Sequence, residues 1–97
     1  MFKSGTNWDG ILLGNTRLNT TSATILADAI ENSATLTKLD LSRNRDIDTE
    51  GWIAIANCLK TLSGLEVLDI GDNDMDDESA IRIANELTVR SLEQVHR

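Results

Sequence analysis

The stretch L-T-K-L-D-L-S-R-N at residues 36–44 returns in pattern as L-E-V-L-D-I-G-D-N at residues 65–73. The apolar positions and the closing asparagine coincide at an offset of 29 residues. The segment I-A-N-C-L at 55–59 likewise matches I-A-N-E-L at 83–87, at an offset of 28 residues. Self-similarity at a fixed period of this length is the signature of a repeat architecture. The sequence therefore predicts tandem units rather than one irregular core.

A weaker copy precedes these two units. Residues 10–18, G-I-L-L-G-N-T-R-L, keep the apolar spacing, but Thr16 stands where the later copies have asparagine. A further copy begins at Leu92 and stops inside its own strand. We therefore predict an N-terminal extension at 1–7, an atypical, cap-like first repeat at 8–35, a second repeat at 36–64, a third at 65–91 and a truncated fourth at 92–97.

Each unit has two halves with different periods. The first half alternates apolar and polar residues, as a half-buried strand does, and the second spaces its apolar residues by three and four, as an amphipathic helix does. Thr21, Thr49 and Asp77 are the predicted helix starts, because short oxygen-bearing side chains accept hydrogen bonds from the first free amides. The predicted strands lie near 10–14, 38–42 and 67–71, and the predicted helices near 22–31, 50–60 and 78–88.

The pattern L-x-x-L-x-L-x-x-N, followed by I-A-x-x-L, resembles the leucine-rich repeat, and in particular its ribonuclease-inhibitor-like class. A strand with one apolar face and a helix with one apolar stripe cannot bury both within one repeat, so neighbouring repeats must stack. We therefore predict an α/β fold, a right-handed leucine-rich-repeat solenoid of about three repeats. Its parallel strands would lie on the concave side and its helices on the convex side.

Asn44 and Asn73 close the two clearest strand segments. We interpret them as a structural ladder whose amides turn inward and hydrogen-bond loop backbone that would otherwise be buried without partners. The rival interpretation makes them exposed turn formers.

The residues between the leucines of each strand point away from the helices, towards the concave face. Stacking then aligns Lys38 with Val67 and Asp40 with Asp69, and it adds Leu12 and His96 to the second row. The predicted partner-binding surface comprises these strand residues and the adjoining loop edge: Lys38, Asp40, Ser42, Arg43, Val67, Asp69 and Asp72.

Asp40 and Asp69 would be like charges on neighbouring strands, which is mildly destabilising unless a cation approaches. The functional interpretation is a docking point for a lysine or arginine of a partner. The alternatives are two solvated carboxylates, or neutralisation of Asp40 within the chain by Arg43 and Arg45.

Composition narrows the classes of function. Sixteen Asp and Glu residues against nine Lys and Arg give a net charge of −7, whereas nucleic-acid affinity comes mainly from cationic side chains. We therefore predict no nucleic-acid partner. No segment approaches the roughly 20 apolar residues of a membrane-spanning helix, so we predict no membrane insertion. The single cysteine and the absence of an apolar signal segment predict an intracellular, cytoplasmic location.

Residues that could carry chemistry are scarce. His96 is the single histidine, and Cys58 is interpreted as a semi-exposed filler without a neighbouring base. The acidic run D-N-D-M-D-D-E at 72–78 lacks the glutamate that closes a calcium-binding EF-hand loop, because the twelfth residue from Asp72 is Ile83. We therefore predict no enzyme activity, no cofactor and no metal site.

The resemblance implies a protein–protein interaction module that binds a protein partner through the concave strands and adjoining loops. One alternative is a small structural subunit of a larger assembly, held by its exposed solenoid ends and capable of end-to-end association. Some relatives of this repeat class activate small GTPases, which gives a further alternative. That activity would need a catalytic loop and more repeats than this sequence contains.

Overall fold

The computed structural model describes residues 10–88 and 94–96. The predicted extension at 1–7 lies outside the described residues, as do both ends of the predicted fragment at 92–97. In chain order the elements are β1 (Gly10–Leu12), α1 (Thr20–Ile30), β2 (Lys38–Asp40), α2 (Thr49–Leu59), β3 (Val67–Asp69), α3 (Asp77–Thr88) and β4 (Gln94–His96).

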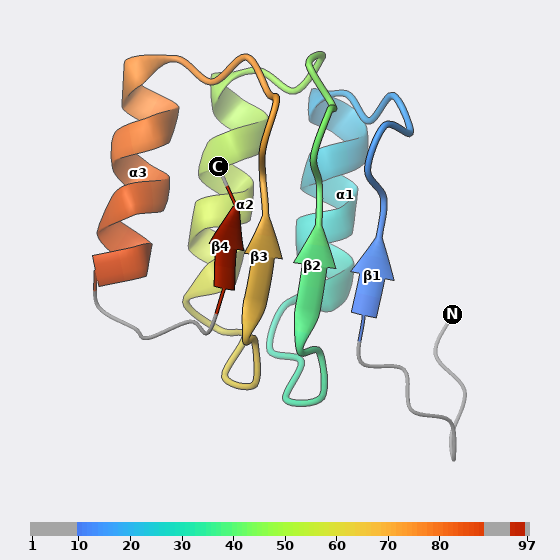
Figure 1. Cartoon of the computed structure of the whole chain (residues 1–97), viewed down its shortest axis with the longest axis vertical. Coiled ribbons are helices and arrows are strands. Elements are labelled where there is room, and N and C mark those ends of the chain that lie inside the picture. The colour runs from blue at the N-terminus through green and yellow to red at the C-terminus, as the bar shows by residue number, and fades with distance from the viewer. Residues whose placement is uncertain (1–9, 89–93, 97) are drawn as a thin grey trace.

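The strands form one parallel sheet in the order β1-β2-β3-β4. The helices form a second layer against one face of this sheet, and no helix of residues 10–88 covers the other face (Figure 1). Strands β1 and β2 are each followed by a helix that returns the chain to the start of the next strand, the right-handed connection that parallel strands adopt. The α/β solenoid predicted from the sequence is confirmed.

The core lies between the sheet and the helices. Leu39 and Leu68 occupy the same position in neighbouring strands, and both are fully buried. They meet Trp52 and Ile55 in the same hydrophobic cluster, and these two residues of α2 are also fully buried. Helix α2 packs against both α1 and α3, so the middle repeat carries much of the buried apolar surface. Burial of each large apolar side chain contributes about 2 kcal/mol to folding.

Polar side chains fix the start of each helix. Asn19 precedes α1, Asp48 precedes α2 and Asp76 precedes α3. Each side chain has an Oδ1 atom that accepts a hydrogen bond from an amide of the first helical turn. The donors and their N–O distances are Ser22 at 2.8 Å, Gly51 at 3.4 Å and Ser79 at 2.8 Å.

The predicted capping residues were therefore wrong by one or two positions. Thr49 and Asp77 are the first residues of their helices, and Thr21 is the second residue of α1. A cap must stand outside the helical geometry to reach forward to the free amides, and Asn19 and Asp48 have extended backbones that allow this.

The strands also end two residues earlier than predicted, although cross-strand bonding continues. The Leu13 amide donates to the Asp40 carbonyl at 2.8 Å, and the Leu41 amide donates to the Asp69 carbonyl at 2.8 Å. The chain beyond each strand therefore remains stacked on its neighbour while it turns towards the helix layer.

Candidate functional site

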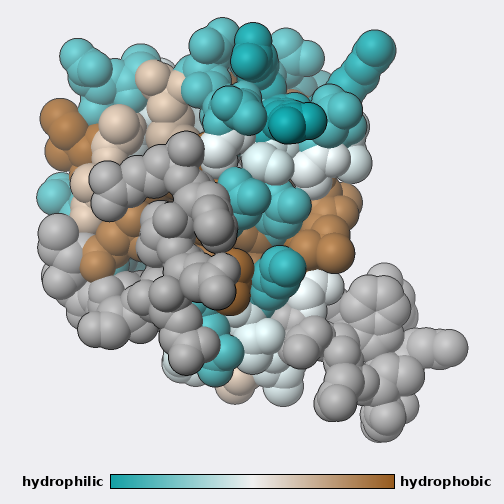
Figure 2. Space-filling view, in the orientation of Figure 1, coloured by the Kyte–Doolittle hydropathy of each residue, from teal (hydrophilic) through white to brown (hydrophobic). Residues whose placement is uncertain are grey.

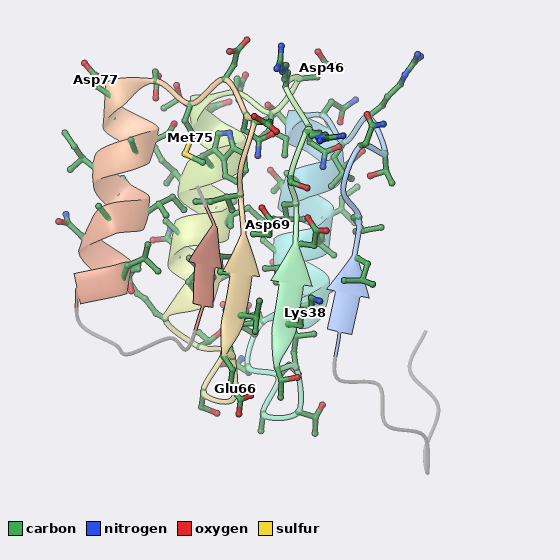
Figure 3. The ribbon with its side chains drawn as sticks, viewed as in Figure 1. Lys38, Asp46, Glu66, Asp69, Met75 and Asp77 are labelled. Atoms are coloured by element: carbon green, nitrogen blue, oxygen red, sulfur yellow. The ribbon has the colours of Figure 1, made fainter. Side chains whose placement is uncertain are left out.

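The strand face opposite the helices presents two rows of residues. Lys38 and Val67 are register partners, and so are Asp40 and Asp69. Lys38 is exposed, whereas the other three residues are half-buried. Lys38 and Asp69 project from this face (Figure 3), and hydrophilic residues gather above it where the loops after the strands lie (Figure 2). The structure thus brings the strand members of the predicted surface together on one face.

The two aspartates are held by local hydrogen bonds. Oδ1 of Asp40 accepts from the Ser42 amide at 2.9 Å and from the Ser42 hydroxyl at 2.7 Å. Oδ1 of Asp69 accepts from the Gly71 amide at 3.0 Å. Each carboxylate is therefore oriented by the residue two positions further along the chain.

The loop members of the predicted surface form an ion pair of their own. Arg43 Nε lies 3.5 Å from a carboxylate oxygen of Asp72, and both side chains are well exposed. Both residues adopt the left-handed conformation with φ of 57°, at equivalent positions of neighbouring repeats. Arg45 Nε donates to the Asp72 carbonyl at 3.4 Å. Arg43 is therefore paired with Asp72 rather than with Asp40.

Asn44 is the most connected side chain of the loop region. It is only 1% exposed, and its Oδ1 accepts from the amides of Thr16 at 3.2 Å and Leu18 at 2.9 Å. Its Nδ2 donates to the carbonyls of Leu13 at 2.8 Å and Leu41 at 3.1 Å. One buried amide therefore ties the loop of the preceding repeat to the strand of its own.

Asn73 repeats this arrangement one unit further on. Its Oδ1 accepts from the Asn44 amide at 2.7 Å. Its Nδ2 donates to the carbonyls of Leu41 at 3.1 Å and Ile70 at 2.9 Å. The two asparagines thus form successive rungs between neighbouring loops.

Residues 32–56 and 64–84 match the family model described as Leucine Rich repeat. The chain is a leucine-rich repeat protein.

Relatives of this chain in different animals carry the same name. The chain is similar to protein phosphatase 1 regulatory subunit 37 of Homo sapiens, with 37% identity over 79 residues. It is 36% identical over 77 residues to the protein of the same description from Danio rerio. These alignments cover 81% and 79% of this chain. They cover only 11% and 8% of the relatives, so this chain spans a small part of the length of those proteins.

Neighbouring leucine-rich repeats are also joined at their helix starts. The Asp48 amide donates to the Thr20 hydroxyl at 2.8 Å, and the Thr49 hydroxyl donates to the Asp76 carboxylate. A hydrogen bond with the Thr20 side chain is the main reason that the pKa of Asp48 lies below its ordinary value. Hydrogen bonds from Ser79 and then Thr49 lower the pKa of Asp76 in the same way. No sequence pattern predicted these contacts, although the pairs T-T at 20–21 and D-T at 48–49 stand at the starts of α1 and α2.

The predicted surface did not include Leu12, a further residue of the strand face. Leu12 stands beside Asp40 in the register and is 63% exposed. Strand alternation places Ile11 and Leu13 on the helix side and Leu12 on the opposite face. That alternation was a sufficient signal, and Leu12 belongs to the candidate surface.

A hollow of about 330 Å³ lies between the chain that follows β3 and helix α3. Its lining is mainly apolar, including Ile70, Met75, Ile83 and Leu87. Met75 lies between the sheet and the helix layer near this hollow (Figure 3). The hollow is a second candidate contact surface, beside the last helix of the described stack.

Cys58 is buried rather than semi-exposed. Desolvation by burial, with a smaller effect of the Glu31 charge, raises the pKa of its thiol to about 11. The thiol is therefore protonated and unreactive at neutral pH.

Residues 10–88 and 94–96 hold no cluster of three or more His, Cys, Asp or Glu side chains suited to a metal ion. Within the same ranges, no helix has the length and apolar character needed to cross a bilayer.

Proposed function

We propose that this leucine-rich repeat protein is a protein–protein interaction module that binds a protein partner through its concave strand face and adjoining loops, without catalysis. The candidate surface comprises Leu12, Lys38, Asp40, Ser42, Arg43, Val67, Asp69 and Asp72. The observation that carries the proposal is the exposed Leu12 beside the charged rows of this face. An apolar side chain framed by polar ones is typical of residues that become buried when a partner binds.

Cys58 is not proposed as a nucleophile, because burial raises the pKa of its thiol to about 11 and disfavours the reactive thiolate. The relatives suggest where the partner is to be sought. They are described as regulatory subunits of protein phosphatase 1, and we propose that an assembly containing this phosphatase includes the partner.

The test is affinity capture from the source cell with a concave variant and a matched convex variant. The concave variant carries Leu12→Ser and Lys38→Ser, and the control carries Ile25→Ser on α1 and Lys60→Ser directly after α2. Leu12 and Ile25 are 63% and 64% exposed, so both variants remove equally accessible apolar surface. Both also remove one exposed lysine.

We expect a partner that is retained by the natural chain and the control, and strongly depleted with the concave variant. Immunoblotting of the captured material for protein phosphatase 1 tests the second part of the proposal. Equal retention by both variants would contradict binding through the concave face. It would favour the alternative of a structural subunit held at its ends, for which the apolar hollow beside α3 offers a surface.

A further inference from the structure

We infer that the concave face receives an arginine side chain of its protein partner between Asp40 and Asp69, with the stem of that arginine against Leu12. This inference rests on the proposed function and specifies the partner's chemistry.

The two carboxylates are neighbours and are already oriented. Asp40 and Asp69 are register partners on adjacent parallel strands, which lie about 4.8 Å apart. Their Oδ1 atoms accept the bonds from Ser42 and Gly71. Among the described residues, no donor is hydrogen-bonded to the Oδ2 atom of either aspartate. Each carboxylate therefore keeps an oxygen that can accept from outside.

Neither described ion pair joins a lysine or an arginine to Asp40 or Asp69. Arg43 is bound to Asp72, and Lys60 pairs with Glu86 at 3.8 Å. Lys38 lies on the same face, but neither of the described ion pairs includes it. Two like charges in adjacent register repel one another, so a cation from a partner would relieve that repulsion as well as gain its own hydrogen bonds.

The surroundings favour a long cation with an apolar stem. Gly14 lies beside Asp40, where a Cβ atom would stand only 3.2 Å from both carboxylate oxygens and 2.8 Å from the Ser42 hydroxyl. The absence of a side chain at Gly14 therefore keeps the carboxylate accessible. Leu12 adds apolar surface next to Asp40, on which the methylene groups of an arginine can pack. Arginine suits the site better than lysine, because its planar guanidinium can donate to two carboxylates at once.

The test uses peptides selected from a random phage-displayed library on the natural chain. We expect recovered peptides to carry an arginine beside an apolar residue. Fluorescence anisotropy then gives their dissociation constants for the natural chain, for Asp40→Asn/Asp69→Asn, and for Asp46→Asn/Asp74→Asn on the exposed loops. Both variants change the net charge from −7 to −5, so they differ only in where charge is removed. Asparagine also keeps an oxygen to accept the bonds from Ser42 and Gly71.

Loss of charge-assisted hydrogen bonds predicts about tenfold weaker binding with Asp40→Asn/Asp69→Asn and little change with the loop control. Replacing the peptide arginine by citrulline, its uncharged analogue, should weaken binding to the natural chain about tenfold and leave binding to the Asn pair unchanged.

Three results would overturn the inference. One is a selection that yields no arginine peptide whose affinity depends on Asp40 and Asp69. Another is an equal loss of affinity with the two charge-matched variants, since that would report net charge alone. Peptides that lose affinity with Leu12→Ser but not with Asp40→Asn/Asp69→Asn would also overturn it, while leaving the proposed function intact.

Discussion

The loop that holds Asn44 and the loop that holds Thr16 occupy equivalent positions in neighbouring repeats, yet they use these residues differently. Asn44 is buried and bonds the amides of Thr16 and Leu18 and the carbonyl of Leu13, all in the preceding repeat. Thr16 is exposed, and its hydroxyl donates only to the nearby Leu13 carbonyl at 2.7 Å. Asn44 therefore supplies hydrogen bonds to the backbone of the preceding loop.

This difference explains why the described stack tolerates threonine at position 16. No described loop lies before Thr16 for a buried amide to serve, whereas Asn44 and Asn73 each have one. The asparagine of a repeat is thus a connection between repeats rather than a local feature of one turn. The following substitutions test that view.

Asn44→Leu should have the largest effect. Leucine has similar volume but leaves the Thr16 and Leu18 amides without their acceptor, so we expect a loss of about 3 kcal/mol in the free energy of unfolding. Urea denaturation followed by circular dichroism measures it. Asn57→Leu, on the exposed side of α2, is the matched control and should change stability little. Similar losses of unfolding free energy for Asn44→Leu and Asn57→Leu would contradict a special role for the buried Asn44 amide.

Asn73→Leu should lower the free energy of unfolding by less, about 2 kcal/mol, because the Asn73 Oδ1 accepts from one amide rather than two. That amide belongs to Asn44, so the two rungs should be coupled. A double-mutant cycle in urea is expected to give a free-energy change for Asn44→Leu/Asn73→Leu that is smaller than the sum of the single changes. Strict additivity would show that the rungs act independently.

Acid should destabilise the starts of α2 and α3 more than the start of α1. Asn19 caps α1 with a neutral amide, whereas the carboxylates of Asp48 and Asp76 have pKa values below their ordinary 3.8. A lowered folded-state pKa gives stabilisation that is complete above the unfolded value and lost as the pH falls through the folded value. Stability should therefore fall below about pH 4.

Nuclear magnetic resonance can localise that loss. Between about pH 6 and about pH 2.5, the Gly51 and Ser79 amides should lose protection from hydrogen exchange more than the Ser22 amide does. Asp48→Asn/Asp76→Asn should abolish the difference. Equal loss at all three helix starts would contradict it.

Substitution of Thr16 should have the smallest effect. Thr16→Val removes one exposed hydrogen bond, so we expect a change within about 0.5 kcal/mol in the same urea experiment. Thr16→Asn should also raise the free energy of unfolding only slightly, because the described stack has no preceding loop with which the new side-chain amide could bond. A gain comparable to the loss from Asn44→Leu would show that an asparagine stabilises its own turn.

Repeat alignment predicted the features that recur in each unit. The register of Asp40 with Asp69 and the layer of Leu39 with Leu68 follow directly from the offset between copies. Alignment failed where a residue depends on its place in the stack. Cys58 aligns with the exposed Ala29, yet it is buried, because α2 has a neighbouring helix on each side. Leu12 stands where the next two copies have aspartates, so alignment did not reveal its exposed apolar side chain.

The helix caps show a different limit of sequence reasoning. Short polar residues occur in runs before each helix, and several of them could serve as the cap. The choice of Asp48 over Thr49 depends on backbone geometry, and Thr20 of the preceding helix helps to fix it. That contact joins residues 28 positions apart, so no local pattern contains it.

The most direct test of a binding role for the concave face is a residue-level footprint. The isotope-labelled chain would be titrated with the protein that the natural chain captures, and amide chemical shifts would be followed. We predict that the largest changes fall within 10–14, 38–43 and 67–72, the strands and the loop residues of the candidate surface. Changes confined to α1 and α2, or to the hollow lined by Ile83 and Leu87, would contradict the account.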